Sequence, residues 1–257
     1  MFPFPIIPSV GNPLINVDAA DFDGTNDYAT RGAGLTGISD SKIFTFTSWV
    51  IRDTSTTSKL FASTTALGGS SSRFALGKNV TTNTFSILGR NSASSTILDA
   101  TSTNGIPASQ WVWVGISVDL SDTNKRHLYF NDTSELSVVT YTNDTIDFTD
   151  ADWCFGAFGD GTQKWNGGFA ETMFWPGAYI DFSQESNRRK FISGSGKPVN
   201  PAAIGGAIDT LGTPIVYFHL DDGETANNFV ANNDRGATGG AFTVTGTLST
   251  YTTSPSD

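Results

Sequence analysis

The sequence has little charge and almost no thiol or imidazole chemistry, and each shortage excludes a class of protein. Charged residues make up 16% of the 257 residues, against about 25% in an average soluble domain, which disfavours coiled coils and charge-rich helical bundles. The single cysteine, Cys154, forms no disulfide within the chain, so the fold must be stable without covalent cross-links. The two histidines, His127 and His219, are far apart in the sequence, which argues against a histidine-based zinc site.

Basic residues are also scarce. Fifteen Lys and Arg against 25 Asp and Glu give a net charge of −10, and nucleic-acid binding depends on clustered Lys and Arg, so we expect no nucleic-acid partner. No apolar run approaches the roughly 18 residues of a membrane span, so we expect no membrane insertion. Residues 1–8 have no basic residue and are broken by prolines, unlike a signal peptide. These features favour synthesis in a host cytoplasm and release by lysis, as for proteins of a virion surface.

Aromatic residues and glycine are abundant. The chain contains 19 Phe, 6 Trp and 27 Gly, and 38% of it is hydrophobic, which is enough to bury a core and offset the entropy of ordering the chain. The length suits a single all-β domain, a class that commonly runs to about 200–250 residues.

Two segments show the two-residue period of β-strands. Residues 43–51 and 111–120 each place apolar side chains at alternate positions, and residues 121–130 then supply a turn and a returning partner strand. The alternating apolar positions are Phe44, Phe46 and Val50 in the first segment, and Val112, Val114, Ile116, Val118 and Leu120 in the second.

Further short strands, separated by Gly, Asn, Ser and Asp, predict an all-β fold rather than a parallel α/β fold. They are expected at residues 58–63, 74–77, 84–90, 136–141, 153–158, 168–175, 215–220 and 241–248. One short helix is expected at residues 182–192, with Asp181 or Ser183 as its cap. Residues 194–212 are rich in Gly, Ala and Pro and are expected to form a long connection. The prediction is one antiparallel β-sandwich over residues 20–250.

The two ends of the chain are expected to lie outside this sandwich. Residues 1–19 begin with several prolines that favour an extended arm, and residues 251–257 are expected to be a flexible tail. The apolar side chains of the arm either pack on the domain's own surface or insert into a neighbouring subunit. The four side chains concerned are Phe2, Phe4, Ile6 and Ile7.

Several segments together resemble the laminin-G-like, concanavalin A-like jelly-roll domains that occur in bacterial surface proteins and tailed-phage structural proteins. In the central hairpin, Thr133 stands where glycine is usual in these domains. The resemblance covers roughly residues 20–248 and implies a jelly-roll sandwich, a fold that carries hydrolases, lectins and adhesion modules alike. The segments that carry it are residues 21–28, 44–50, 111–120, 126–132, 153–156 and 169–175.

Glycoside hydrolases of this fold, as the resemblance implies, set two or three carboxylates at alternate positions on one strand. The sequence has no Glu-x-Asp-x-x-Glu pattern, and no second carboxylate is expected within reach of Glu171 on its face of the strand. Cys154 lies in an apolar strand, where a buried and inert thiol is expected. We therefore expect a protein that is not an enzyme.

Calcium is the one metal ion for which the sequence offers ligands, because carboxylates in loops suit a hard cation and related domains often bind one. The favoured set is Asp160 with Asp221 or Asp222. The alternative is that the acidic residues serve as turn residues and edge charges. The wider set of candidates is Asp21, Asp23, Asp27, Asp150, Asp152 and Glu224.

Carbohydrate binding needs aromatic faces for sugar rings and polar side chains for hydroxyl groups. The best local candidate is the loop 159–168, in which a tryptophan stands among glycines and polar residues. Its candidate residues are Asp160, Lys164, Trp165 and Asn166, and outward-facing aromatics elsewhere are Trp111, Trp113 and Tyr129.

The function predicted from the sequence is that of a non-enzymatic structural protein of a tailed-phage virion. We expect a capsid-surface decoration or head-fibre protein, anchored to virion proteins by its N-terminal arm and present as a homo-oligomer such as a trimer. The alternative is a glycan-binding adhesin or a receptor-binding module of a tail fibre, for which the partner is a host-surface glycan.

Overall fold

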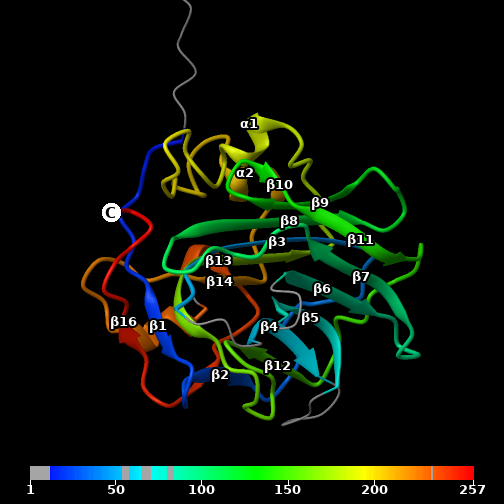
Figure 1. The fold of residues 1–257 in the computed structure, drawn as a ribbon, viewed down its shortest axis with the longest axis horizontal. Coiled ribbons are helices and arrows are strands. Elements are labelled where there is room, and N and C mark those ends of the chain that lie inside the picture. The colour runs from blue at the N-terminus through cyan, green and yellow to red at the C-terminus, as the bar shows by residue number, and fades with distance from the viewer. Residues whose placement is uncertain (1–11, 54–57, 65–70, 80–83, 233) are drawn as a thin grey trace, which may run out of the picture.

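The computed structural model describes residues 12–53, 58–64, 71–79, 84–232 and 234–257. Within these residues the chain forms a sandwich of two antiparallel sheets (Figure 1). The strands of the first sheet are β1 (Ala20–Asp23), β3 (Ile43–Val50), β8 (Val112–Asp119), β9 (Arg126–Phe130), β10 (Thr133–Ser134), β13 (Asn166–Pro176), β14 (Val216–Phe218) and β16 (Ser249–Thr250). Their order is β10-β9-β8-β3-β13-β1-β16, with β14 also paired to β13.

The second sheet has the order β11-β7-β6-β5-β4-β12-β2-β15. Its strands are β2 (Tyr28–Arg31), β4 (Ser58–Thr64), β5 (Ser72–Lys78), β6 (Phe85–Arg90), β7 (Thr96–Ser102), β11 (Leu136–Tyr141), β12 (Asp152–Phe155) and β15 (Thr243–Thr245). The predicted all-β sandwich is thus confirmed, although β7 was not expected as a strand.

The alternating pattern of β3 and β8 sets the two faces of the first sheet. The two strands pair along their whole length, with Phe44 opposite Val118 and Phe46 opposite Ile116, and these apolar side chains enter the space between the sheets. Every residue of β8 is buried, so the strand is covered on both faces instead of one.

Aromatic rings fill the space between the sheets. Phe44 of β3 meets Phe74 of β5 edge to face, with ring centroids 5.2 Å apart. Phe155 of β12 contacts Phe169 of β13 at 4.6 Å. Edge-to-face pairs of this kind add about 0.5–1.5 kcal/mol each to the free energy of burial, so they stabilise a chain that has no cross-links.

A second hydrophobic cluster covers the outer face of the first sheet. Trp49, Trp113 and Trp175 point outward from their strands and are packed under the long connection after β13. Phe182 and Phe191 of that connection pack against Trp113, with ring centroids 5.3 Å and 5.6 Å away. We call residues 176–212 the cover segment.

The cover segment contains two short helices, α1 (Glu185–Arg188) and α2 (Ala207–Leu211). Helix α1 is therefore shorter than the helix expected over residues 182–192, and α2 lies where only a connection was expected. The Asp181 carboxylate accepts hydrogen bonds from the amide and hydroxyl of Ser183, which forms a turn, and burial of Phe182 and Phe191 fixes the chain on either side of α1. Two 3-10 helices, η1 (Ala226–Val230) and η2 (Asp234–Gly236), follow β14. No helix among the described residues is long and apolar enough to cross a membrane.

The first described residues of the chain are bonded to its C-terminal residues. Val17 is buried in the second cluster. Its amide donates a hydrogen bond to the Ser256 hydroxyl, and its carbonyl accepts one from the Ser254 hydroxyl. Residues 12–19 and 251–257 thus pack on the domain, contrary to the expectation of an arm that extends to residue 19 and a flexible tail. The apolar side chains of Phe2, Phe4, Ile6 and Ile7 lie outside the described residues.

Truncating one ring of the inter-sheet core tests how much the sandwich depends on it. Phe74 is fully buried and contacts five aromatic neighbours, so Phe74→Ala is expected to lower the free energy of unfolding by about 3–5 kcal/mol. Chemical denaturation measures this change. Ile204→Ala, at a side chain that is 99% exposed, is the control and is expected to change stability by less than about 0.5 kcal/mol; similar costs for the two variants would contradict this account of the core.

Candidate functional site

The loop that the sequence favoured for sugar binding does not expose its tryptophan. Trp165 is fully buried in the inter-sheet core, where its Nε1 donates to the Ile51 carbonyl at 3.1 Å. Glycine permits this approach, because a Cβ at Gly167 would lie 2.2 Å from the same Ile51 oxygen. The prediction that Trp165 presents a sugar-binding face is therefore wrong, since its ring is packed 5.0 Å from the ring of Phe169.

The other candidates in this loop have local roles. The Asp160 carboxylate accepts hydrogen bonds from the amide and hydroxyl of Thr162, as a turn residue does. The Lys164 ammonium donates to the Gly161 carbonyl and lies 5.7 Å from the centre of the Tyr28 ring. Asn166 begins β13 and pairs with Asp23 of β1.

The proposed calcium ligands are not gathered into a site. Asp160 lies in the β12–β13 loop, whereas Asp221 and Asp222 follow β14, and Asp221 is bonded to His219. Among the described residues, no group of three or more Asp, Glu, His or Cys side chains is placed to hold a metal ion. Asp160, Asp221 and Asp222 therefore do not form the predicted group of ligands; the Asp160 carboxylate bonds to Thr162 and that of Asp221 to His219.

An open pocket lies between the β7–β8 connection and the β9–β10 hairpin. We call it the rim pocket; its volume is about 220 Å³. Its lining combines two aromatic residues, Trp111 and Phe130, with several polar ones. Its lining residues are Asn104, Gly105, Pro107, Gln110, Trp111, Val112, Phe130, Asn131, Thr133 and Glu135.

Trp111 is the aromatic wall of the rim pocket, and the C-terminal segment fixes its position. Its Nε1 donates to the Thr253 hydroxyl at 3.1 Å, and its ring meets Tyr251 edge to face at 5.7 Å. Tyr251 in turn donates from its hydroxyl to Asp53. The side chain is thus only partly exposed and already ordered, which reduces the entropy cost of binding a ligand against it.

Glu135 and Asn104 form the polar end of the pocket. The Glu135 carboxylate is buried, with 5% of the residue exposed, and it accepts from the Asn104 backbone amide at 2.8 Å. The Asn104 side-chain amide donates to both carboxylate oxygens at 3.2 Å. These bonds hold the β7–β8 connection against the hairpin and orient the Glu135 carboxylate.

The hairpin that carries Glu135 is fixed by its own turn. Asn131 takes a left-handed conformation with φ of 52°, which an asparagine adopts more readily than most residues, and its side-chain oxygen accepts from the Trp113 amide at 2.9 Å. Asn131 therefore supplies the tight turn, although Thr133 replaces the usual glycine. On the other side, Asp132 pairs with Arg188 and Arg189 of the cover segment at 2.8 Å, and the hydrogen bonds from Arg189 lower the pKa of Asp132.

A buried polar network lies on the outer face of the first sheet, around Glu171. The register between β13 and β3 shifts between Ala170 and Met173, and Glu171 has a positive φ of 45°. This bulge directs the Glu171 carboxylate to Tyr217 and His219. The Tyr217 hydroxyl donates to one carboxylate oxygen at 2.7 Å, and His219 Nδ1 contacts the other.

His219 links two carboxylates, because its Nε2 lies 2.8 Å from Asp221. The expectation that no second carboxylate reaches Glu171 thus misses Asp221, which connects through the imidazole. Burial lowers the pKa of His219, but the hydrogen bonds and charges of Glu171 and Asp221 outweigh it and raise the pKa to about 9. Burial raises the pKa of Tyr217 well above its usual value. Both Glu171 and His219 are less than 5% exposed, whereas the Asp221 side chain is 69% exposed.

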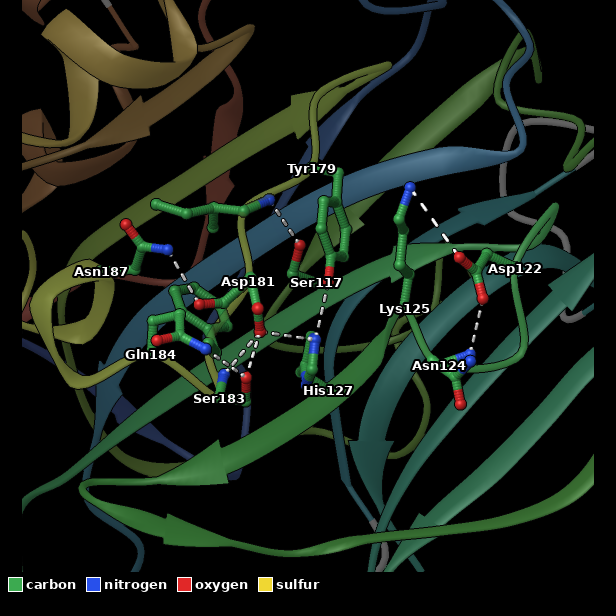
Figure 2. A network of polar contacts seen from close by, with 12 residues as sticks. Ser117, Asp122, Asn124, Lys125, His127, Tyr179, Asp181, Ser183, Gln184 and Asn187 are labelled. Carbon is green, nitrogen blue, oxygen red and sulfur yellow. Dashed lines mark hydrogen bonds and ion pairs between the residues drawn. The ribbon is translucent and has the colours of Figure 1, made fainter.

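A second network fastens the start of the cover segment (Figure 2). His127 Nε2 lies 2.8 Å from the Tyr179 hydroxyl and 3.2 Å from Asp181, and the Ser117 hydroxyl accepts from the Ile180 amide at 3.0 Å. Burial lowers the pKa of His127 and raises that of Tyr179 to about 12. These polar groups are engaged in holding residues 179–183 on β8 and β9.

Cys154 is buried, as expected. Its thiol donates to the Ala62 carbonyl, and burial raises its pKa, which disfavours the reactive thiolate.

The sequence analysis did not predict Asn104, Gln110, Asn131 and Glu135 as pocket residues. The only signal for them was their position beside strand 111–120 and its hairpin.

The His219 network predicts a loss of stability in mild alkali. The pKa of His219 is about 9 in the folded protein and about 6.5 when unfolded, so its stabilising effect is complete below pH 6.5 and is lost as the pH rises to 9. We expect the free energy of unfolding to fall by on the order of 2 kcal/mol over this range. His219→Gln is expected to remove the slope, as measured by denaturation at several pH values.

His127→Gln is the control for this experiment. The pKa of His127 is lowered, so it titrates below pH 6.5, and its replacement is expected to leave the slope between pH 7 and 9 unchanged. An unaltered slope in His219→Gln would show that another group titrates in this range.

Comparison with known proteins agrees with the architecture. The family model described as the concanavalin A-like lectin/glucanases superfamily matches residues 23–180. No curated protein matches the sequence. A Bacteroides ovatus structure described as a "putative carbohydrate binding protein" is 15% identical, with a TM-score of 0.62 over 93% of this chain and 61% of that one.

Two other solved structures are among those found to be similar. A heptameric SAP-like pentraxin from Limulus polyphemus is 14% identical, covers 62% of this chain and 76% of its own, and has a TM-score of 0.44. Domains LG4-5 of the mouse laminin alpha1 chain are 14% identical, with a TM-score of 0.41 over 61% of this chain and 40% of theirs. On the family match and the observed sandwich, the chain belongs to the concanavalin A-like lectin/glucanases superfamily.

Proposed function

We propose that this protein is a glycan-binding module and that the rim pocket is its binding site. The observation that carries the proposal is a pocket whose lining combines the ordered Trp111 with the polar residues Asn104, Gln110 and Glu135. A pyranose ring has an apolar face that packs on an aromatic ring and hydroxyl groups at its edge that pair with amides and carboxylates. The similarity to the Bacteroides ovatus structure is consistent with this proposal.

The pocket supports binding rather than hydrolysis. Glycoside hydrolysis needs a pair of carboxyl groups about 5–9.5 Å apart across the scissile bond. Glu135 is the one carboxylate among the residues that line the rim pocket, and the carboxylates around His219 are engaged in the buried network. We therefore propose that the module is not an enzyme.

A glycan array followed by titration calorimetry tests the proposed site. Trp111→Ala is expected to weaken binding at least about tenfold, because the aromatic wall is lost, while Trp111→Phe keeps part of the affinity. Lys164→Ala, in the loop that the sequence favoured, is the control and is expected to bind as the wild type does. If Lys164→Ala loses binding and Trp111→Ala retains it, the site lies in that loop and not in the rim pocket.

A second proposed function is attachment to a tailed-phage virion, as a decoration or head-fibre protein at the virion surface. It is supported by two exposed apolar side chains, Leu14 at 59% and Ile204 at 99%. Leu14 forms a bridge with Val199, five residues before Ile204 in the sequence. The tryptophans give no support for an oligomer, because among them only Trp111 is more than 2% exposed.

Removing residues 1–11 tests attachment and assembly. The shortened protein also carries Leu14→Ser and Ile204→Ser and is expected to stay folded. We expect it to be absent from the virion particles that are sedimented from the lysate of the cells that produce it. Light scattering on both forms measures the oligomeric state. Equal recovery of the full-length and shortened proteins in the particle fraction would contradict attachment by this end of the chain.

A further inference from the structure

We propose, on the basis of the glycan-binding function above, that the rim pocket takes one uncharged sugar residue at the end of a glycan chain and rejects residues that carry a carboxylate or sulfate. The proposal rests on three features of the pocket: the charge of its lining, the bonds that fix Glu135, and its size.

The lining of the rim pocket has a negative charge and no positive one. Glu135 is its only ionisable side chain, and no Lys, Arg or His lines it. Three basic residues that bond to segments beside the pocket are engaged: Arg188 and Arg189 pair with Asp132, and the Arg52 Nε donates to the Ile106 carbonyl. An anionic group in the pocket would therefore meet a carboxylate with no basic side chain in the lining, a repulsion that gives specificity against it.

Glu135 cannot easily turn away from such a ligand. Its carboxylate is held by the Asn104 backbone amide at 2.8 Å and by the Asn104 side chain, and its own backbone amide donates to Leu128 at 2.8 Å. An ionised carboxylate accepts about four hydrogen bonds, and Asn104 supplies three contacts. The remaining acceptor capacity suits a sugar hydroxyl, which donates, and not a second carboxylate, which only accepts.

The size of the pocket limits the ligand to about one ring. Its volume of about 220 Å³ is below the roughly 300–1,000 Å³ of sites for drug-sized ligands. Trp111 forms one wall, and Asn131 and Thr133 of the hairpin form another. A residue at the end of a chain fits this space better than one inside a chain, which needs an exit for the glycan on both sides.

Matched pairs of oligosaccharides test the inference. Each pair ends in a hexose or in the corresponding uronic acid, so that a CH₂OH group is replaced by a carboxylate at one carbon; glucose, galactose and mannose give three pairs. We expect the best-bound hexose to bind at least about tenfold more tightly than its uronic acid. The same hexose with one further residue attached at the chain end is expected to bind more weakly.

Glu135→Gln tests the cause of the selectivity. It removes the charge and keeps an acceptor, so we expect the difference between hexose and uronic acid to shrink several-fold. Glu185→Gln, which makes the same change in net charge on α1, is the matched control and is expected to keep the difference. Thermal melting checks that both variants are folded. Salt gives a second measurement on the wild type, because screening is expected to strengthen uronic-acid binding and leave hexose binding unchanged.

The outcomes separate this inference from the proposed function. If neither member of any pair binds, the glycan-binding function itself is wrong. If uronic acids bind as tightly as hexoses, or if Glu135→Gln keeps the full difference, glycan binding stands and the selectivity proposed for Glu135 is overturned.

Discussion

The packing of aromatic rings between the two sheets is the interaction on which the rest of the structure depends. The chain has one cysteine and so no internal disulfide, and stability must come from burial. Rings from both sheets, such as Phe44 and Phe74, meet edge to face, and even Trp165, at the end of a glycine-rich loop, is drawn into this core. Because most of the tryptophans are buried in packed cores, only Trp111 remains partly exposed.

The outer face of the first sheet is also buried, which removes it as a binding surface. The cover segment brings Phe182 and Phe191 onto Trp113, and polar networks hold it there through His127 and through the pairing of Asp132 with two arginines. Beneath and around the cover, Glu171 contacts His219, and the bonds and charges of Glu171 and Asp221 raise the pKa of His219 against the effect of its burial.

The rim pocket lies where three chain segments meet at the edge of the sandwich. The β7–β8 connection supplies Asn104 and Trp111, the β9–β10 hairpin supplies Glu135, and the C-terminal segment orients Trp111 through Thr253. Because each of these segments is fixed by hydrogen bonds, the binding proposed for this pocket would require little ordering of the protein.

The sequence by itself determined the class of fold. The two-residue period of residues 43–51 and 111–120 assigned their inward faces correctly, since alternation is a local property of a strand, and the resemblance to jelly-roll domains agrees with the family match. Only the tertiary structure decided the sites. Trp165 is buried because the glycine-rich backbone can approach Ile51, and the carboxylates of Asp160 and Asp221 bond to Thr162 and His219 instead of sharing a metal ion. Such contacts join residues that are distant in the chain, and no local sequence pattern predicts them.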